Sequence, residues 1–119
     1  MGDLHDRSEL SYRRIIETAN EGVWVLDPAG RTTYANAKIA ALLGYSAEEM
    51  ASLSLYDVLD EPGKDRAAAN LELRREGQSA QLECSYLRKD GTPVWVLLNA
   101  SPLFDEAGGY LGSVSLVSE

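Results

Sequence analysis

The stretch KDGTPVWVLLNASPLFDEAGGYLGSVSLVSE, Lys89–Glu119, decides the fold. Asp90-Gly91 is a strong hairpin signal before a strand over Val94–Ser101, and a looser turn at 105–109 precedes a strand over 110–117. A strand with one wet face alternates apolar and polar residues, but VWVLLNAS places apolar side chains on both faces. We therefore expect both faces of this strand to pack against other parts of the protein or against a partner.

Three more strands are predicted upstream of this stretch. Residues 80–86 alternate between apolar positions (Leu82, Cys84) and polar ones, which predicts a strand with one dry and one wet face. Residues 23–26 and 32–35 flank the turn sequence DPAG, which predicts a hairpin of two short strands.

Short helices are predicted between the first hairpin and the later strands. Asn36 is placed to cap a helix over 37–43 that ends at Gly44, and Ser46 and Glu49 have the spacing of a capping box. A single turn follows at 55–59. A longer helix over 64–75 has Pro62 ahead of it, where a missing N–H donor is tolerated, and closes at Gly77.

The arrangement predicts an α+β fold in one domain. Residues 4–19 have apolar residues at helical intervals, so we expect an amphipathic lead-in helix within 1–20 and a folded core over 21–119. Antiparallel strands joined by hairpins, with helices segregated to one side, define the α+β class.

Composition excludes several functions. Eleven Lys and Arg against nineteen Asp and Glu give a net charge of −8, which repels nucleic acid, and we interpret Arg13-Arg14 and Arg74-Arg75 as solvated helix faces. One cysteine excludes an internal disulfide, and no long apolar run appears. We expect a cytoplasmic protein without direct membrane contact, or the cytosolic part of a membrane-anchored receptor.

Four segments in order resemble the PAS sensor domains: GVWVLDPAGRTTYAN, LLGYSAEEM, RKDGTPVWV and SPLFDEAGGYLG. The resemblance spans nearly everything from residue 12 to residue 119. It implies a five-stranded antiparallel sheet in the order 2-1-5-4-3, with short helices closing over one face to make a pocket. It also implies one module of a longer signalling protein, which passes a ligand or redox state to a histidine kinase, a cyclase or another output domain in cis.

The resemblance also assigns the faces of the strands. It points Val94, Val96, Leu98 and Ala100 toward the helices, together with Tyr110, Gly112, Val114 and Leu116 of the last strand. The candidate residues for an apolar ligand pocket are Trp24, Leu26, Ile39, Leu43, Leu55, Val58, Leu71, Leu82, Cys84, Val96, Leu98 and Val114. Trp24 is open to two interpretations, since it either fills the pocket or lines its wall and stacks on a flat ligand.

The identity of any ligand stays open, but two cofactors are not expected. The similar light sensors need a cysteine in the region that matches residues 53–59, where there is none, and their inward asparagine and glutamine match Val96 and Val114. Haem-binding members use a histidine of the longer helical region, and the one histidine here is His5. We interpret Cys84 as a small buried hydrophobe rather than a redox switch.

The opposite face of the sheet is predicted to be an interface. The same parity points Trp95, Leu97, Leu111 and Val117 away from the helices, where a large apolar patch marks a contact site. We expect the lead-in helix, through Tyr12, Ile15 and Ile16, and a second copy of the domain to cover it in a homodimer. The alternative is that the lead-in helix covers its own sheet without a partner.

No enzymatic site is predicted. Asp27 and Asp90 fall at turns, Asp60 and Glu49 fall at helix starts, and no metal-ligand cluster or Ser-His-Asp set appears. The leading hypothesis is a sensory and dimerisation module. A ligand-free structural dimerisation domain is the main alternative, and a small isomerase-type enzyme with a carboxylate inside the pocket is the third.

Overall fold

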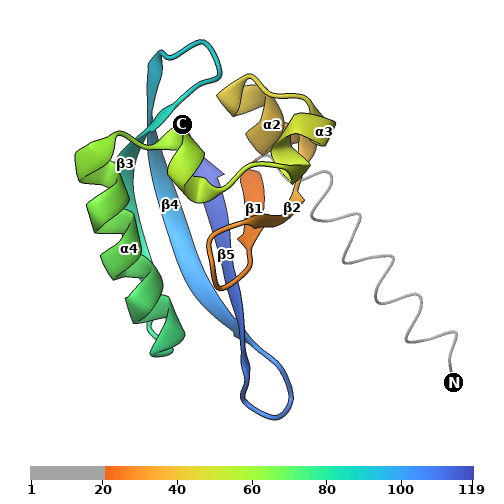
Figure 1. The fold of residues 1–119 in the computed structure, drawn as a ribbon, viewed down its shortest axis with the longest axis vertical. Helices are drawn as coiled ribbons and strands as arrows, with labels where there is room; N and C mark the ends of the chain where they lie inside the picture. The colour runs from red at the N-terminus through yellow and green to blue at the C-terminus, as the bar shows by residue number, and fades with distance from the viewer. Residues whose placement is uncertain (1–20) are drawn as a thin grey trace, which may run out of the picture.

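A single antiparallel sheet organises the molecule, with strands in the order β2-β1-β5-β4-β3, as the resemblance implies (Figure 1). The structure is a computed structural model that describes residues 21–119, so the predicted lead-in helix and its Tyr12, Ile15 and Ile16 lie outside the described residues. The strands are β1 (Gly22–Leu26), β2 (Thr32–Ala35), β3 (Ala80–Leu87), β4 (Pro93–Phe104) and β5 (Tyr110–Ser118). The chain has the α+β fold that its sequence predicts.

The helices lie between β2 and β3, where the capping signals place them. They are α2 (Ala37–Leu43), α3 (Ala47–Ala51), the 3-10 turn η1 (Leu55–Val58) and α4 (Glu61–Arg75). The capping box of Ser46 and Glu49 is present. Asp60 caps α4, so this helix begins three residues before the prediction. None of the helices in residues 21–119 has the length and apolar character to span a bilayer.

Asn36 joins the first strand to the first helix. Its side-chain oxygen accepts hydrogen bonds from the backbone N–H of Ile39, as the N-cap of α2, and from that of Val23 in β1, at 3.1 and 2.9 Å. The left-handed Gly44 then ends α2 with a φ of 81°. This one buried side chain therefore fixes where the helix leaves the sheet.

One face of the sheet is covered by helices. In Figure 1, α4 runs along β3 and β4, while α2 and α3 lie near β1 and β2. Most of the core lies on this covered face, including Trp24, Leu26, Ile39, Leu43, Met50, Val58, Tyr86, Val94, Val96, Leu98, Ala100 and Val117. Along β4 the predicted parity holds, because Val94, Val96, Leu98 and Ala100 are buried while Trp95 and Leu97 are exposed.

The predicted parity of β5 is wrong beyond its first residues because of a β-bulge. Leu103 pairs with Gly112 and Phe104 with Tyr110, so Leu111 is an extra residue on β5. An extra residue sends every later side chain to the opposite face. Beyond the bulge, Ser113, Ser115 and Val117 face the helices, as their buried partners on neighbouring strands do.

Three assignments are corrected by this bulge. Val114 and Leu116 were expected to face the helices, and both point to the other side of the sheet, paired with Val25 and Val23 of β1. Val117 was expected in the interface, but it is 1% exposed and belongs to the core, beside its partner Leu98.

Candidate functional site

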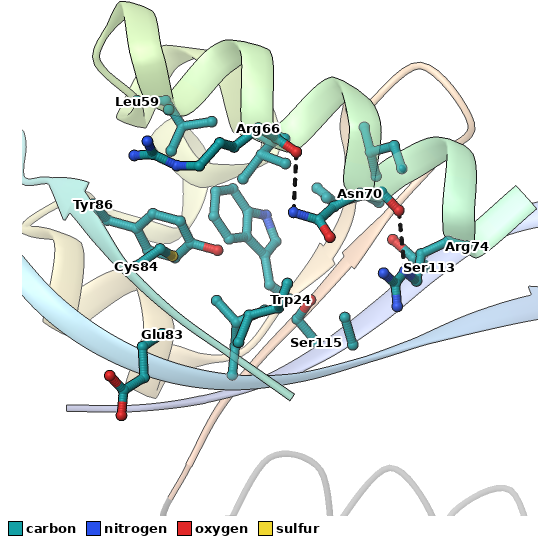
Figure 2. Close-up of a pocket in the computed structure, with 18 of the residues that line it drawn as sticks. Trp24, Leu59, Arg66, Asn70, Arg74, Glu83, Cys84, Tyr86, Ser113 and Ser115 are labelled. Carbon is teal, nitrogen blue, oxygen red and sulfur yellow. Dashed lines mark hydrogen bonds between the residues drawn. The ribbon is translucent and has the colours of Figure 1, made fainter. Parts of the chain in front are cut away.

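A partly enclosed cavity of about 170 Å³ lies between α4 and the sheet (Figure 2). Its lining comes from every strand of the sheet except β2, and from η1 and α4 with the loop between them. The lining residues are Trp24, Leu26, Leu55, Leu59, Gly63, Arg66, Ala67, Asn70, Leu71, Arg74, Leu82, Glu83, Cys84, Ser85, Tyr86, Leu98, Ala100, Ser113 and Ser115.

Most of the candidate pocket residues lie on this wall. Trp24, Leu26, Leu55, Leu71, Leu82, Cys84 and Leu98 line the cavity. Ile39, Leu43, Val58 and Val96 are buried in the core but do not reach it. Val114 is on the far side of the sheet, for the reason given above.

Trp24 stands at the middle of the cavity wall (Figure 2). Its ring meets Tyr86 edge to face, with centroids 5.8 Å apart and an interplanar angle of 87°. Its indole N–H donates to Thr32 Oγ1 at 2.8 Å, and the Thr32 hydroxyl donates to the Leu53 carbonyl oxygen at 2.8 Å. Trp24 is therefore both fully buried and part of the wall, so the two interpretations of this residue are not exclusive.

One end of the cavity is polar and carries Arg74, Asn70, Ser113 and Ser115 (Figure 2). Arg74 is 1% exposed, so its interpretation as part of a solvated helix face is wrong. Its Nε–H donates to the Asn70 carbonyl oxygen at 3.2 Å and its Nη1 to the Gln78 carbonyl oxygen at 2.9 Å. Nη2 is buried without a hydrogen-bond partner in residues 21–119.

The spacing of polar residues along α4 is the signal that sequence reasoning missed. Arg66, Asn70 and Arg74 are four residues apart, which places them on one face of the helix. In the structure, that face is the one that meets the cavity. A helical stripe that mixes two arginines and an asparagine on the covered side indicates a polar wall.

The other end of the cavity carries Tyr86 and Cys84 (Figure 2). Burial raises the pKa of both the Tyr86 hydroxyl and the Cys84 thiol above their ordinary values. A thiol held in its protonated form is a poor nucleophile. This supports the interpretation of Cys84 as a small hydrophobe.

The carboxylates have the local roles that their positions predict. Asp27 accepts hydrogen bonds from the backbone N–H of Ala29 and Arg31. These bonds lower the pKa of Asp27, and the bond from Arg31 is the largest cause.

Glu83 is the carboxylate among the lining residues, and its side chain points away from the ring of Trp24 (Figure 2). Within residues 21–119, no group of acidic, histidine or cysteine side chains is arranged to hold a metal ion.

The outer face, the side of the sheet away from the helices, carries the apolar residues that β4 and β5 turn outward. Trp95 is 71% exposed, and Leu97, Leu111 and Leu116 are also exposed. Of the predicted interface residues, Trp95 and Leu97 lie there, Leu111 is exposed at the bulge, and Leu116 takes the place expected for Val117.

The fold and the cavity beneath its helices are those of the PAS class of domains, and comparison with known proteins agrees. The family model described as the PAS fold matches residues 10–117, so the chain belongs to the PAS family.

Relatives of known structure have the same fold. A domain of the sensory box sensor histidine kinase/response regulator from Geobacter sulfurreducens superposes with a TM-score of 0.79, at 24% identity, over 98% of this chain and 96% of that one. An RNA-binding light-oxygen-voltage receptor superposes with a TM-score of 0.79, at 23% identity, over 92% of this chain and 32% of that one.

A curated relative is much longer than this chain. The sensor histidine kinase TmoS of Ectopseudomonas mendocina is 28% identical over 94% of this chain, and the match covers 12% of that protein. The region shared with TmoS is therefore a small part of a large signalling protein.

Proposed function

We propose that this PAS domain is a sensory module that binds a small molecule in the cavity between α4 and the sheet. The observation that carries the proposal is the cavity itself, about 170 Å³ in volume, with a mostly apolar wall and a few converging polar groups. Binding pockets for small molecules have this character. The volume supports a compound with one ring rather than a larger cofactor such as haem or a flavin.

Copurification of a ligand tests this proposal. Mass spectrometry of gently purified protein, under native and then denaturing conditions, should release a small molecule from the wild-type domain. Ala67→Leu fills the cavity from α4 and should abolish the release. Ala69→Leu adds the same side chain to an exposed position of the same helix and should leave it unchanged. An empty wild-type domain that also binds no compound from a library of one-ring molecules would contradict the proposal.

We further propose that the domain passes its ligand state to an output domain in the same polypeptide. The relative TmoS supports a histidine kinase as the output, since the match covers 12% of that sensor kinase. A cyclase is the other output that we consider. This role places the domain in the cytoplasm, either free or as the cytosolic part of a membrane-anchored receptor. It requires no catalytic residue, no metal and no nucleic acid within the domain.

The outer face supports a second proposal, that the domain is a homodimer through this surface. Trp95 and its exposed apolar neighbours on β4 and β5 form a patch of the kind found at protein contacts. Ligand binding on the covered face of the sheet could then shift the strands and change the dimer contact on the outer face. A domain that only dimerises and binds no ligand is the alternative function, and the mass spectrometry above separates the two.

Sedimentation velocity tests the dimer. Trp95→Lys should convert the domain to a monomer, because it replaces the most exposed large apolar side chain of the patch with a charge. Leu73→Lys is the control, since Leu73 is an exposed apolar residue on α4, away from the outer face, with 37% exposure against 71% for Trp95. A wild-type domain that stays monomeric at the highest protein concentration accessible to sedimentation velocity, or an unchanged dimer in Trp95→Lys, would contradict the proposal.

A further inference from the structure

Arg74 has an unbalanced charge inside the protein. Its side chain is 1% exposed, and no carboxylate of residues 21–119 forms an ion pair with it. A buried ion without a partner costs several kcal/mol in typical proteins. The position of Arg74 on the cavity wall therefore suits an anion that residues 21–119 do not supply.

The guanidinium has one nitrogen left for such an anion. Nε and Nη1 already donate to the backbone carbonyl oxygens of Asn70 and Gln78, which fix the plane of the group. Nη2 has no acceptor among the described residues, although both of its hydrogens can donate. The side chain is thus held in place with its free donors at the polar end of the cavity (Figure 2).

Two neighbours, Ser113 and Ser115, add donors at the same end. The β-bulge turns Ser113 and Ser115 toward the cavity, where their hydroxyls lie beneath α4 (Figure 2). Tyr110, at the start of β5, does not line the cavity, and its hydroxyl is the other buried side-chain group without a hydrogen-bond partner in residues 21–119. Its ring is held by Arg75, whose guanidinium carbon lies 4.9 Å from the ring centroid. A group that accepts several hydrogen bonds would satisfy this cluster, and a carboxylate has that chemistry.

The charge and the volume limit the ligand further. Arg66 and Glu83, the other charged residues of the lining, are exposed, so Arg74 supplies the single buried charge on the wall. One buried positive charge balances a monoanion, whereas a phosphate dianion would leave an excess negative charge in the interior. A cavity of about 150 Å³ lined by apolar side chains holds a benzene ring, and this one is about 170 Å³.

We propose that the ligand is a one-ring monocarboxylate, with its carboxylate at Arg74, Ser113 and Ser115 and its ring against Trp24. This inference rests on the proposed sensory function, because it names the ligand class of the same cavity. Trp24 and Tyr86 provide an aromatic wall on which a ring packs, and Arg74 provides the charge that distinguishes an acid from a neutral compound.

Calorimetric titration with paired probes tests the inference. The probes are benzoate, phenylacetate and 3-phenylpropionate, each beside its neutral amide of nearly the same shape. At least one carboxylate should bind the wild-type domain about tenfold or more tightly than its amide, as expected for hydrogen bonds to a charged group. Arg74→Gln should abolish this preference. The control Arg31→Gln, which changes an exposed arginine outside the cavity lining, should keep it.

Other outcomes are also decisive. Equal binding of acids and amides to the wild-type domain would overturn the inference and leave the sensory function standing. Binding of neither set would overturn the inference as well, and the copurification experiment would then judge the sensory function separately. If Arg74→Gln does not fold, the double variant Ser113→Ala, Ser115→Ala replaces it, with a two- to fivefold loss of acid preference expected and an unchanged preference contradicting the proposal.

Discussion

β4 and β5 are neighbours in the middle of the sheet, and both carry apolar residues at most positions, yet only one of them has a simple parity. β4 alternates from Val94 to Ala100, with one side chain buried and the next exposed. β5 contains the bulge at Leu111, so its inward residues beyond that point are Ser113, Ser115 and Val117 rather than the expected Val114 and Leu116. The comparison teaches that one extra residue decides which chemistry reaches the cavity.

The largest effect should come from removing the bulge's glycine. Gly112 has a φ of 129°, and a Cβ placed there would lie 1.9 Å from the Leu26 carbonyl oxygen of the adjacent strand. Gly112→Ala should therefore lower the free energy of unfolding by about 3 kcal/mol or more. Urea denaturation followed by circular dichroism measures this change.

Gly108→Ala provides the control for backbone conformation alone. Gly108 also has a positive φ, 87°, but a Cβ there would meet nothing within 4 Å. Its alanine variant should lose about 1 kcal/mol, which is the cost of the left-handed conformation without a clash. Equal losses in the free energy of unfolding at the two glycines would show that the close approach of β5 to β1 at Gly112 adds nothing to the cost of the alanine.

A smaller effect should distinguish the two faces of β5. Val117→Ala removes methyl groups from the core and should cost about 2 kcal/mol. Leu116→Ala, at a residue that is 41% exposed, should cost less than about 1 kcal/mol when measured at a protein concentration low enough to exclude dimers. The reverse order would restore the parity that the family resemblance implied.

The smallest perturbation is a cysteine scan of the same two faces. In a Cys84→Ala background, Ser115→Cys should react slowly with a charged thiol reagent, because Ser115 is 8% exposed and faces the helices. At a protein concentration low enough to exclude dimers, Leu116→Cys should react about tenfold faster or more, since its side chain is 41% exposed. Similar rates, followed by absorbance of the released product, would contradict the assigned faces.

Local signals predicted most of the fold. The cap at Asn36, the stop at Gly44 and the capping box of Ser46 and Glu49 each depend on a few adjacent residues, so the sequence states them directly. The order of the strands was predicted from the family resemblance, because the pairing of strands that are distant in sequence does not depend on any one local segment.

The parts that sequence reasoning missed depend on tertiary contacts. An isolated glycine in a strand pattern is a known sign of a β-bulge, and Gly112 is such a glycine. The local sequence does not determine which residue of β5 is the extra one, because that depends on pairing with β4. Arg74 was misread because an arginine pair is usually solvated, and only the packing of α4 on the sheet buries one of the two. The polar end of the cavity therefore could not be predicted from composition.

The two faces of the sheet have one tryptophan each, and this gives the protein two built-in optical reporters. Trp24 lies in the dry interior beside the cavity, and Trp95 is 71% exposed on the outer face. Indole emission shifts to the red in water, so iodide should quench the red part of the spectrum first. A ligand in the cavity and a partner on the outer face can then be followed in one unlabelled sample.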